Sequence, residues 1–280
     1  MFSWQARPAA APPFTRLRFR GGEVSFEPAI QIGTMSKIVE RTLDFLELFA
    51  DQKRPLSLSD ISRLLSIPVS SCHDVLQALQ DRGFIYEVSP RGGYYPTLRM
   101  YEAGKVIAEN DPVLLRADYQ LRELRDELDE SVLLAKVSGL RGTYLLSFET
   151  SHPLRFQLKV GNNFTSLHAT SAGKALLATL DEAELEAALD EIEFTAFTPS
   201  TVKSKAALRE HIALGRERGW YLNAEESMDG LTTLSAPFLW HQSVYIVTIA
   251  APSSRLDGKL ETTARKLVDV CARLEMKTGR

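Results

Sequence analysis

The stretch that decides the fold runs from Leu58 to Thr97 and reads LSDISRLLSIPVSSCHDVLQALQDRGFIYEVSPRGGYYPT. Its first part has apolar residues at positions 58, 61, 64 and 65, a spacing that puts them on one face of a short helix. Ser57 or Ser59 can cap this helix, because a serine oxygen accepts from a free backbone N–H. Pro68 lacks an N–H and pushes the residue before it out of the helical region. We therefore expect the helix to end in a tight turn.

A second helix is expected directly after the turn, with Ser70 or Ser71 as its cap and Gly83 at its end. Apolar residues recur at helical spacing on its buried side and leave polar residues on its outer side. The apolar set is Val75, Leu76, Leu79 and Phe84, and the outer set is Val69, Ser71, His73 and Asp74.

Residues 84–88 and 94–97 are expected to form the two strands of a hairpin, since Gly92 and Gly93 can supply positive φ where the chain reverses. Two short helices on a tight turn followed by a hairpin are typical of a winged helix-turn-helix. The alternative is that the three elements are ordinary parts of a small α+β domain. The specific order of the elements favours DNA binding.

Length and composition predict two domains with a sizeable core. The 280 residues are 44% hydrophobic and 25% charged, and no apolar run approaches the length of a membrane-spanning helix. Cys72 and Cys271 lie far apart, and the five histidines show no ligand-like spacing, so we assign neither a metal nor a cofactor. A reducing, cytoplasmic location without membrane contact fits this composition.

The chain is expected to have four parts. Residues 1–33 have proline among alanines and no sustained periodicity, which indicates a flexible extension. The winged helix-turn-helix follows at 34–97, opened by an amphipathic helix that Thr34 or Ser36 caps. Residues 98–129 form a helical linker with proline at a first helical position, Pro112. Its exposed apolar residues can pair with a second copy of the chain.

Residues 130–280 are expected to form one antiparallel sheet with helices on its faces, which makes the fold class α+β. Three consecutive strands are expected at 131–138, 143–149 and 154–160, and three more at 220–223, 231–238 and 244–251. Helices are expected at 172–179, 181–189 and 203–218, and one long amphipathic helix at 253–277.

Two short segments in this half invite a chemical interpretation. Ser171-Ala172-Gly173-Lys174 opens a helix, whose free N–H groups can hold a carboxylate; an ordinary N-cap is the equal alternative. Glu225-Glu226 is an acidic pair for which acid/base work would need a partner, so a solvated loop or capping role is favoured. The sequence contains no GxxxxGK[ST], GxSxG or HExxH motif.

Several motifs in order resemble the IclR family of bacterial transcriptional regulators. The resemblance covers about residues 36–277 and leaves out the first 33. The motifs are Arg41-Thr-Leu-Asp-Phe-Leu46, Leu79-Gln-Asp-Arg-Gly-Phe84, Leu167-His-Ala-Thr-Ser-Ala-Gly-Lys-Ala-Leu-Leu-Ala178, and Arg216-Glu-Arg-Gly-Trp220 leading to Glu225-Glu226, Gly230 and Ala236-Pro237.

The resemblance implies a winged helix-turn-helix joined by a linker helix to a GAF-like effector-binding domain. It also implies operator DNA as partner, a homodimer or dimer of dimers, and a small, often carboxylic or aromatic, acid as effector. Some relatives carry a carboxylate at the position of Asn223, and glycine is common at that of Ser171. The effector site would comprise Ser171, Ala172, Asn223, Leu231, Thr233, Thr248 and Ala250.

The DNA-binding half has no excess of positive charge, since residues 34–110 contain nine basic and ten acidic side chains. Affinity must therefore come from local placement and from dimerisation, which doubles the phosphate contacts. We expect Lys53, Arg54 and Arg91 to contact phosphate. The candidate readers of base edges are Ser70, Ser71 and His73, with Asp74 as an acceptor from cytosine.

The sequence thus predicts a DNA-binding regulator whose operator binding responds to a small organic acid, and no enzyme. The alternative is a small-molecule sensor or enzyme whose winged helix is a protein-interaction module. The slightly acidic balance of residues 34–110 favours that alternative.

Overall fold

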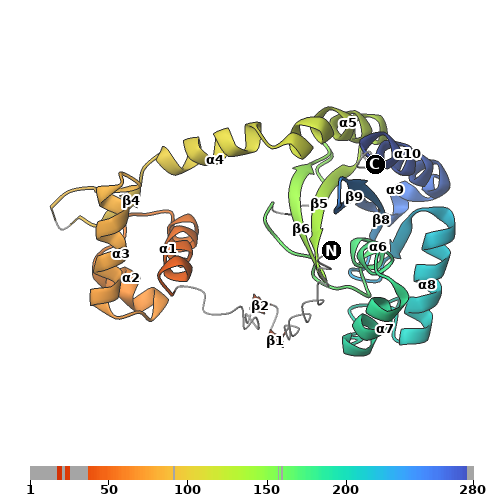
Figure 1. Ribbon diagram of the computed structural model, residues 1–280, viewed down its shortest axis with the longest axis horizontal. Helices are drawn as coiled ribbons and strands as arrows, with labels where there is room; N and C mark the ends of the chain where they lie inside the picture. The colour runs from red at the N-terminus through yellow and green to blue at the C-terminus, as the bar shows by residue number, and fades with distance from the viewer. Residues whose placement is uncertain are drawn as a thin grey trace, which may run out of the picture. The chain divides into compact units, whose positions relative to one another are not determined.

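The computed structural model describes residues 18–20, 23–25, 37–90, 92–156, 158 and 160–275. The chain divides into two compact units, residues 1–107 and 108–280 (Figure 1). Of the first 33 residues, the structure describes only two short antiparallel strands, β1 (Arg18–Arg20) and β2 (Glu23–Ser25). The expected N-terminal caps at 34 and 36 lie outside the described residues.

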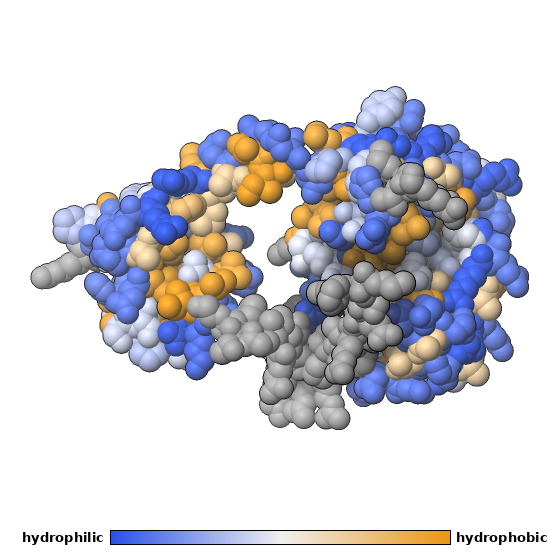
Figure 2. Space-filling model, viewed as in Figure 1, coloured by the Kyte–Doolittle hydropathy of each residue, from blue (hydrophilic) through white to orange (hydrophobic). Residues whose placement is uncertain are grey.

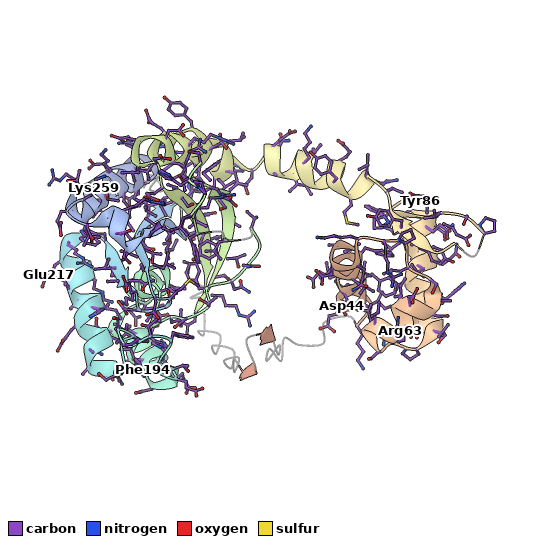
Figure 3. All side chains as sticks on the ribbon, turned by 180° about the vertical axis from the view of Figure 1, so that it is seen from behind. Asp44, Arg63, Tyr86, Phe194, Glu217 and Lys259 are labelled. Carbon is purple, nitrogen blue, oxygen red and sulfur yellow. The ribbon has the colours of Figure 1, made fainter. Side chains whose placement is uncertain are left out.

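Three helices form the core of the first unit. They pack around one apolar cluster, in which Phe45 and Ile61 are fully buried. The outer faces carry charged side chains such as Asp44 and Arg63, which point away from that core (Figure 3). The helices are α1 (Lys37–Gln52), α2 (Leu58–Leu65) and α3 (Val69–Asp81).

The tight turn between α2 and α3 is confirmed, and one of its caps was predicted wrongly. Ser57 caps α2 in a reciprocal capping box with Asp60, and Ser66 ends that helix in the left-handed conformation. The expected cap of α3 at Ser70 or Ser71 is wrong. That helix begins one residue after Pro68, without a side-chain cap, because the fixed φ of proline already suits a helix start.

The wing is the hairpin of β3 (Ile85–Glu87) and β4 (Tyr94–Pro96), in which Ile85 pairs with Pro96. Tyr94 also pairs with Leu56. Gly93 makes this close approach possible, because it has a φ of 89° and a Cβ there would meet the Leu56 backbone at 3.0 Å.

The residues expected to form the linker are helical, and the second of their helices belongs to the second unit. Helix α4 (Arg99–Glu109) is followed by α5 (Pro112–Leu128), whose first residue is the expected proline. The Asp111 side chain caps α5 by accepting from two backbone N–H groups.

The second unit is built on one five-stranded antiparallel sheet, in the order β6-β5-β9-β8-β7 (Figure 1). Successive side chains on a strand alternate between the two faces of a sheet. One face therefore carries Leu134 and Val247, and the other Leu133 and Thr248. The strands are β5 (Ser131–Ser138), β6 (Arg141–Phe148), β7 (Tyr221–Ala224), β8 (Leu231–Trp240) and β9 (Ser243–Pro252).

Helices cover both faces of this sheet. Helices α5 and α10 (Leu260–Leu274) pack on the first face in the largest apolar cluster, with Leu134 and Val247. Helix α6 (Ser171–Leu177) packs on the second face, where its residues Ala172, Ala175 and Leu176 meet Tyr221 and Ile246. The remaining helices are α7 (Glu182–Glu191), α8 (Lys205–Arg218) and α9 (Ser253–Leu256).

Two expectations for this unit are wrong. Among the described residues of 154–160 there is no strand, because Phe156 and Leu158 pack against the sheet and residues 161–164 occupy the outer edge of β6. The expected single C-terminal helix is broken into α9 and α10 at Gly258, whose φ is 69°.

Candidate nucleic-acid interface and buried polar site

Helix α3 presents the expected polar side chains to solvent. Ser70, His73 and Asp74 are exposed and Ser71 is half-buried, whereas the opposite side of the helix packs into the core. The exposed set lies on the helix that follows the tight turn, where a recognition helix reads base edges in the major groove. The structure thus leaves these four candidate readers accessible on one element.

Gln77 is a further candidate reader, which the sequence analysis did not name. It lies four residues after His73 on the exposed side of α3. Its Nε2 donates to the Asp81 carboxylate at 2.7 Å, which leaves the amide oxygen and one N–H available. The spacing of 70, 73 and 77 was the signal that could have identified it.

The basic residues Arg54, before α2, and Arg63, in its last turn, are partly neutralised. Arg54 lies 3.7 Å from the Asp60 carboxylate and Arg63 lies 3.2 Å from it. Hydrogen bonds from Ser57, then from Arg63, lower the pKa of Asp60, so this acid stays charged. Lys53 is exposed, with a φ of 52°. Arg91, the expected contact at the wing tip, lies outside the described residues.

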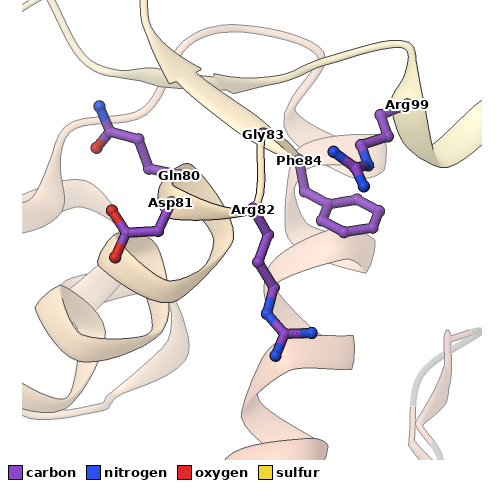
Figure 4. A pocket seen from close by; sticks show the side chains of 6 residues that line it. All are labelled: Gln80, Asp81, Arg82, Gly83, Phe84 and Arg99. Carbon is purple, nitrogen blue, oxygen red and sulfur yellow. The ribbon is translucent and has the colours of Figure 1, made fainter.

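A shallow surface hollow lies at the end of α3 (Figure 4). The Arg99 guanidinium stacks over the Phe84 ring there, 5.1 Å from its centre, and so holds the start of α4 against the wing. None of the expected DNA-contacting residues lines the hollow. Its walls are Gln80, Asp81, Arg82, Gly83, Phe84 and Arg99.

In the second unit, a row of buried polar side chains joins α6 to the sheet. The Ser171 hydroxyl lies 2.6 Å from that of Thr233 and 2.7 Å from that of Ser235. Ser235 in turn lies 2.8 Å from the Thr248 hydroxyl. At the other end of the row, Asn223 Nδ2 donates to Thr233 Oγ1 at 3.3 Å. All five side chains are buried.

The row has one more O–H donor than the hydrogen bonds within it require. Its four hydroxyls carry four O–H donors, but the hydrogen bonds among them number three. Since Asn223 also donates to the row, one O–H remains with no acceptor among the described side chains. A buried donor without an acceptor is unfavourable, so the row is suited to a ligand group that accepts a hydrogen bond.

The other expected effector residues lie beside this row. Leu231 and Ala250 belong to an apolar cluster with Leu133, Ala135 and Tyr144, against which Phe156, Leu158 and Phe164 pack. Thr248 and Ala250 face the same side of the sheet, since they pair with Ser235 and Thr233. Ala172 packs in the neighbouring cluster under α6. The sequence analysis missed Ser235, although it follows Thr233 by two residues on the same strand face.

The start of α6 is capped by its own chain. The Thr170 hydroxyl accepts from the N–H of Gly173 at 3.0 Å, so the N-cap alternative applies to that N–H. Gly173 itself is required by packing, since a Cβ there would lie 2.5 Å from the Leu167 backbone.

Glu226 was expected in a solvated loop or a capping role, and the solvated loop is wrong. Its carboxylate is buried and lies 2.5 and 2.7 Å from the Nζ of Lys174, which is also buried. Burial lowers the pKa of Lys174 and raises that of Glu226, while the attraction between the two charges opposes both shifts. The partner that the sequence could not supply is therefore on α6, 52 residues earlier.

Three further observations concern metal binding, membrane spanning and the two cysteines. Within the part of the chain that the structure describes, no group of three or more His, Cys, Asp or Glu side chains is placed to hold a metal ion. None of the described helices combines the length and the apolar character needed to cross a bilayer. Cys72 and Cys271 are both buried and unpaired.

A winged helix-turn-helix together with a sheet domain that buries a polar row defines the class of DNA-binding regulators with a sensory domain. The family model described as "Bacterial transcriptional regulator IclR C-terminal" matches residues 106–274, and the family model described as "IclR helix-turn-helix domain" matches residues 38–89. The chain belongs to the IclR family, and it is a DNA-binding transcriptional regulator of that type.

The relatives agree with this assignment. The transcriptional regulator XynR of Escherichia coli K12 is 32% identical, over 78% of this chain and 87% of its own. The transcriptional repressor AllR of the same strain is 30% identical, over 92% of this chain and 95% of its own. A solved IclR homologue of Microbacterium hydrocarbonoxydans, complexed with 4-hydroxybenzoate, has the same fold, with a TM-score of 0.70 and 20% identity over 85% of this chain and 98% of its own.

Proposed function

We propose that the chain binds an operator through α3 and the wing, and that a small organic acid bound beside the hydroxyl row changes this binding. The observation that carries the proposal is the surplus O–H donor among Ser171, Thr233, Ser235 and Thr248. A carboxylate is a strong acceptor and supplies what the row lacks. The remaining residues of the effector proposal are Ala172, Asn223, Leu231 and Ala250.

An aromatic body would suit the same acid. The apolar cluster beside the row contains Tyr144, with the Phe164 ring 5.2 Å away, and aromatic rings pack favourably at such distances. A ligand that bridges the row and this cluster would place a carboxylate and an aromatic ring in matching surroundings. The homologue of M. hydrocarbonoxydans holds 4-hydroxybenzoate, a molecule with both groups.

The effect on DNA would require two copies of α3. We expect a homodimer or a dimer of dimers, acting in the cytoplasm, in which the acid biases the relative placement of domains or subunits and so the spacing of the recognition helices. Figure 2 shows hydrophobic residues on the surface along α4, and Tyr101 and Ile107 of this helix are exposed; these side chains support pairing with a second copy. Light scattering on the protein as it leaves a size-exclusion column measures the mass of the assembly.

A protein-interaction role for the winged helix is the second candidate function. It is favoured by the slightly acidic balance of residues 34–110 and by the exposed carboxylate of Asp74 on α3. A salt titration decides between the two, because log affinity falls linearly with log salt concentration when basic side chains release counterions from DNA. The DNA for this titration is the region upstream of the chain's own gene. An affinity for this DNA that does not vary with salt concentration would favour the protein-interaction role.

The effector proposal is tested by a thermal-shift screen of organic acids, each matched with the alcohol that has the same ring or chain. A ligand selective for the folded state raises the melting temperature by mass action. We expect stabilisation by an acid and little by its matched alcohol, and a shift of the operator-binding curve by the same acid. Equal operator affinity with and without every stabilising acid would contradict the proposed regulation.

A further inference from the structure

Lys174 and Glu226 form a buried ion pair beside the polar row. Besides the two carboxylate oxygens, the Lys174 ammonium contacts the Leu222 carbonyl oxygen at 2.8 Å and His211 Nδ1 at 3.0 Å. An ammonium has three N–H donors, so its hydrogen-bonding capacity is filled. The side chains of Lys174 and Glu226 are 1% and 5% exposed, so water contributes little to this site.

The ammonium holds both ends of the short segment that contains Asn223. One contact is to the carbonyl of residue 222 and the other to the side chain of residue 226. Between them, Glu225 has a φ of 58°, a conformation that is unfavourable for a residue with a Cβ. The Thr198 and Thr201 hydroxyls donate to the carbonyls of 225 and 226 and hold the turn from the other side.

The position of residue 226 fixes the orientation of the Asn223 amide. The backbone N–H of Glu226 donates to Asn223 Oδ1 at 2.7 Å, and that of Ser227 donates to the same oxygen at 3.3 Å. Because the NH₂ group of the Asn223 side chain cannot accept these bonds, its oxygen must face the turn. The NH₂ group then faces Ser227 Oγ at 2.9 Å and Thr233 Oγ1 at 3.3 Å.

We infer that Lys174 and Glu226 are positioning residues, which hold the Asn223 amide with its donor side toward the hydroxyl row and so set the hydrogen-bonding character of the ligand site. That this row is a ligand site rests on the proposed function; the placement of the amide does not. A purely stabilising role is a poor explanation, since apolar residues of similar volume often replace a buried ion pair without loss of stability.

The test is the double substitution Lys174→Met/Glu226→Met in the full chain, read by NMR. The Asn223 side-chain amide signal is assigned by its loss in Asn223→Asp, and its hydrogen exchange with water is measured in each variant. We expect the double variant to fold and the exchange of this amide to become faster by about tenfold or more. Unchanged exchange in the folded double variant would overturn the inference.

Two further variants keep the outcome decisive. The matched control is Glu130→Met/Arg255→Met, which removes another largely buried carboxylate–guanidinium pair of the same unit, with contacts of 2.6 Å. It should leave the Asn223 amide exchange unchanged; equal acceleration there would mean general loosening and overturn the inference. If the first double variant fails to fold, Glu226→Gln takes its place and is judged by the same two outcomes.

Ligand binding gives an independent readout, with 4-hydroxybenzoate as the probe. If it stabilises the wild-type chain, we expect at least about tenfold weaker binding by Lys174→Met/Glu226→Met, a loss of about 1.4 kcal/mol. Equal affinity of the two proteins would overturn the inference. If no organic acid stabilises the wild-type chain, the result counts against the proposed function alone, since the exchange measurement needs no ligand.

Discussion

The amide of Asn223 on β7 and the hydroxyl of Thr233 on β8 face each other across paired strands, with Nδ2 3.3 Å from Oγ1. The amide oxygen is held by the backbone N–H groups of Glu226 and Ser227, so Asn223 enters the hydroxyl row as a donor. A side chain that can only accept at this position would take up the surplus O–H proton of the row.

Asn223→Asp should therefore weaken the binding of an acidic effector. The new carboxylate accepts from Thr233, which leaves the row without a spare donor, and it adds a negative charge that repels a ligand carboxylate. We expect at least about tenfold lower affinity, or 1.4 kcal/mol, in a calorimetric titration with an acid that stabilises the wild-type chain. Asn223→Asp with undiminished affinity would show that this acid does not use the row.

Arg54→Ala and His73→Ala should affect DNA binding in different ways. Arg54 is expected to contact phosphate, so its loss should weaken binding to all sequences and reduce the salt slope by about one. His73 is expected at base edges, so its loss should remove about 1–3 kcal/mol of discrimination at one base pair. Lys259→Ala, which removes an exposed charge from the second unit (Figure 3), is the control and should change neither quantity.

Asp74→Asn should raise affinity for every DNA sequence and reduce discrimination at one base pair. The Asp74 side chain is 84% exposed on α3, where its charge would repel phosphate by up to about 1 kcal/mol in water. If its oxygen also accepts from cytosine N4, the amide variant weakens that preference, because its NH₂ group can donate to other bases as well. Fluorescence anisotropy with a set of single-base operator variants measures both effects. Unchanged binding to all of them would place Asp74 away from the DNA.

Local sequence signals were sufficient for most elements. The bounds of α2 and β5 agree with the expected ranges, because helical spacing, a serine cap and alternating apolar residues act within a few neighbours. The winged helix-turn-helix and the antiparallel sheet were predictable for the same reason. The family resemblance supplied Ser171, Thr233 and Thr248, which the structure joins in one row.

The remaining features depend on contacts between distant parts of the chain. The sequence around Glu226 indicates a solvated acid, because its partner Lys174 lies on α6, far away in the sequence. No local pattern encodes that pairing. Residues 154–160 have the composition of a strand, but Phe156 and Leu158 pack on the apolar cluster that contains Leu133, and it is residues 161–164 that bond to the edge of β6. Both errors come from tertiary packing that overrides local preference.

His168 should make the chain less stable as the pH falls. The ring is buried, its Nε2–H donates to the Thr195 carbonyl at 3.0 Å, and Nδ1 accepts from Ser166. Burial lowers the pKa of His168 below its ordinary value of 6.5, and the Lys174 charge lowers it further, although the Thr195 contact opposes both effects. Below that ordinary value the unfolded chain binds more protons than the folded one, so stability falls by up to about 1.4 kcal/mol per pH unit until the folded pKa is reached.

His168→Gln retains a donor toward Thr195 and removes the titration. Urea unfolding across this pH range should show a shallower slope in His168→Gln than in the wild-type chain, and equal slopes would mean that His168 does not couple protonation to folding.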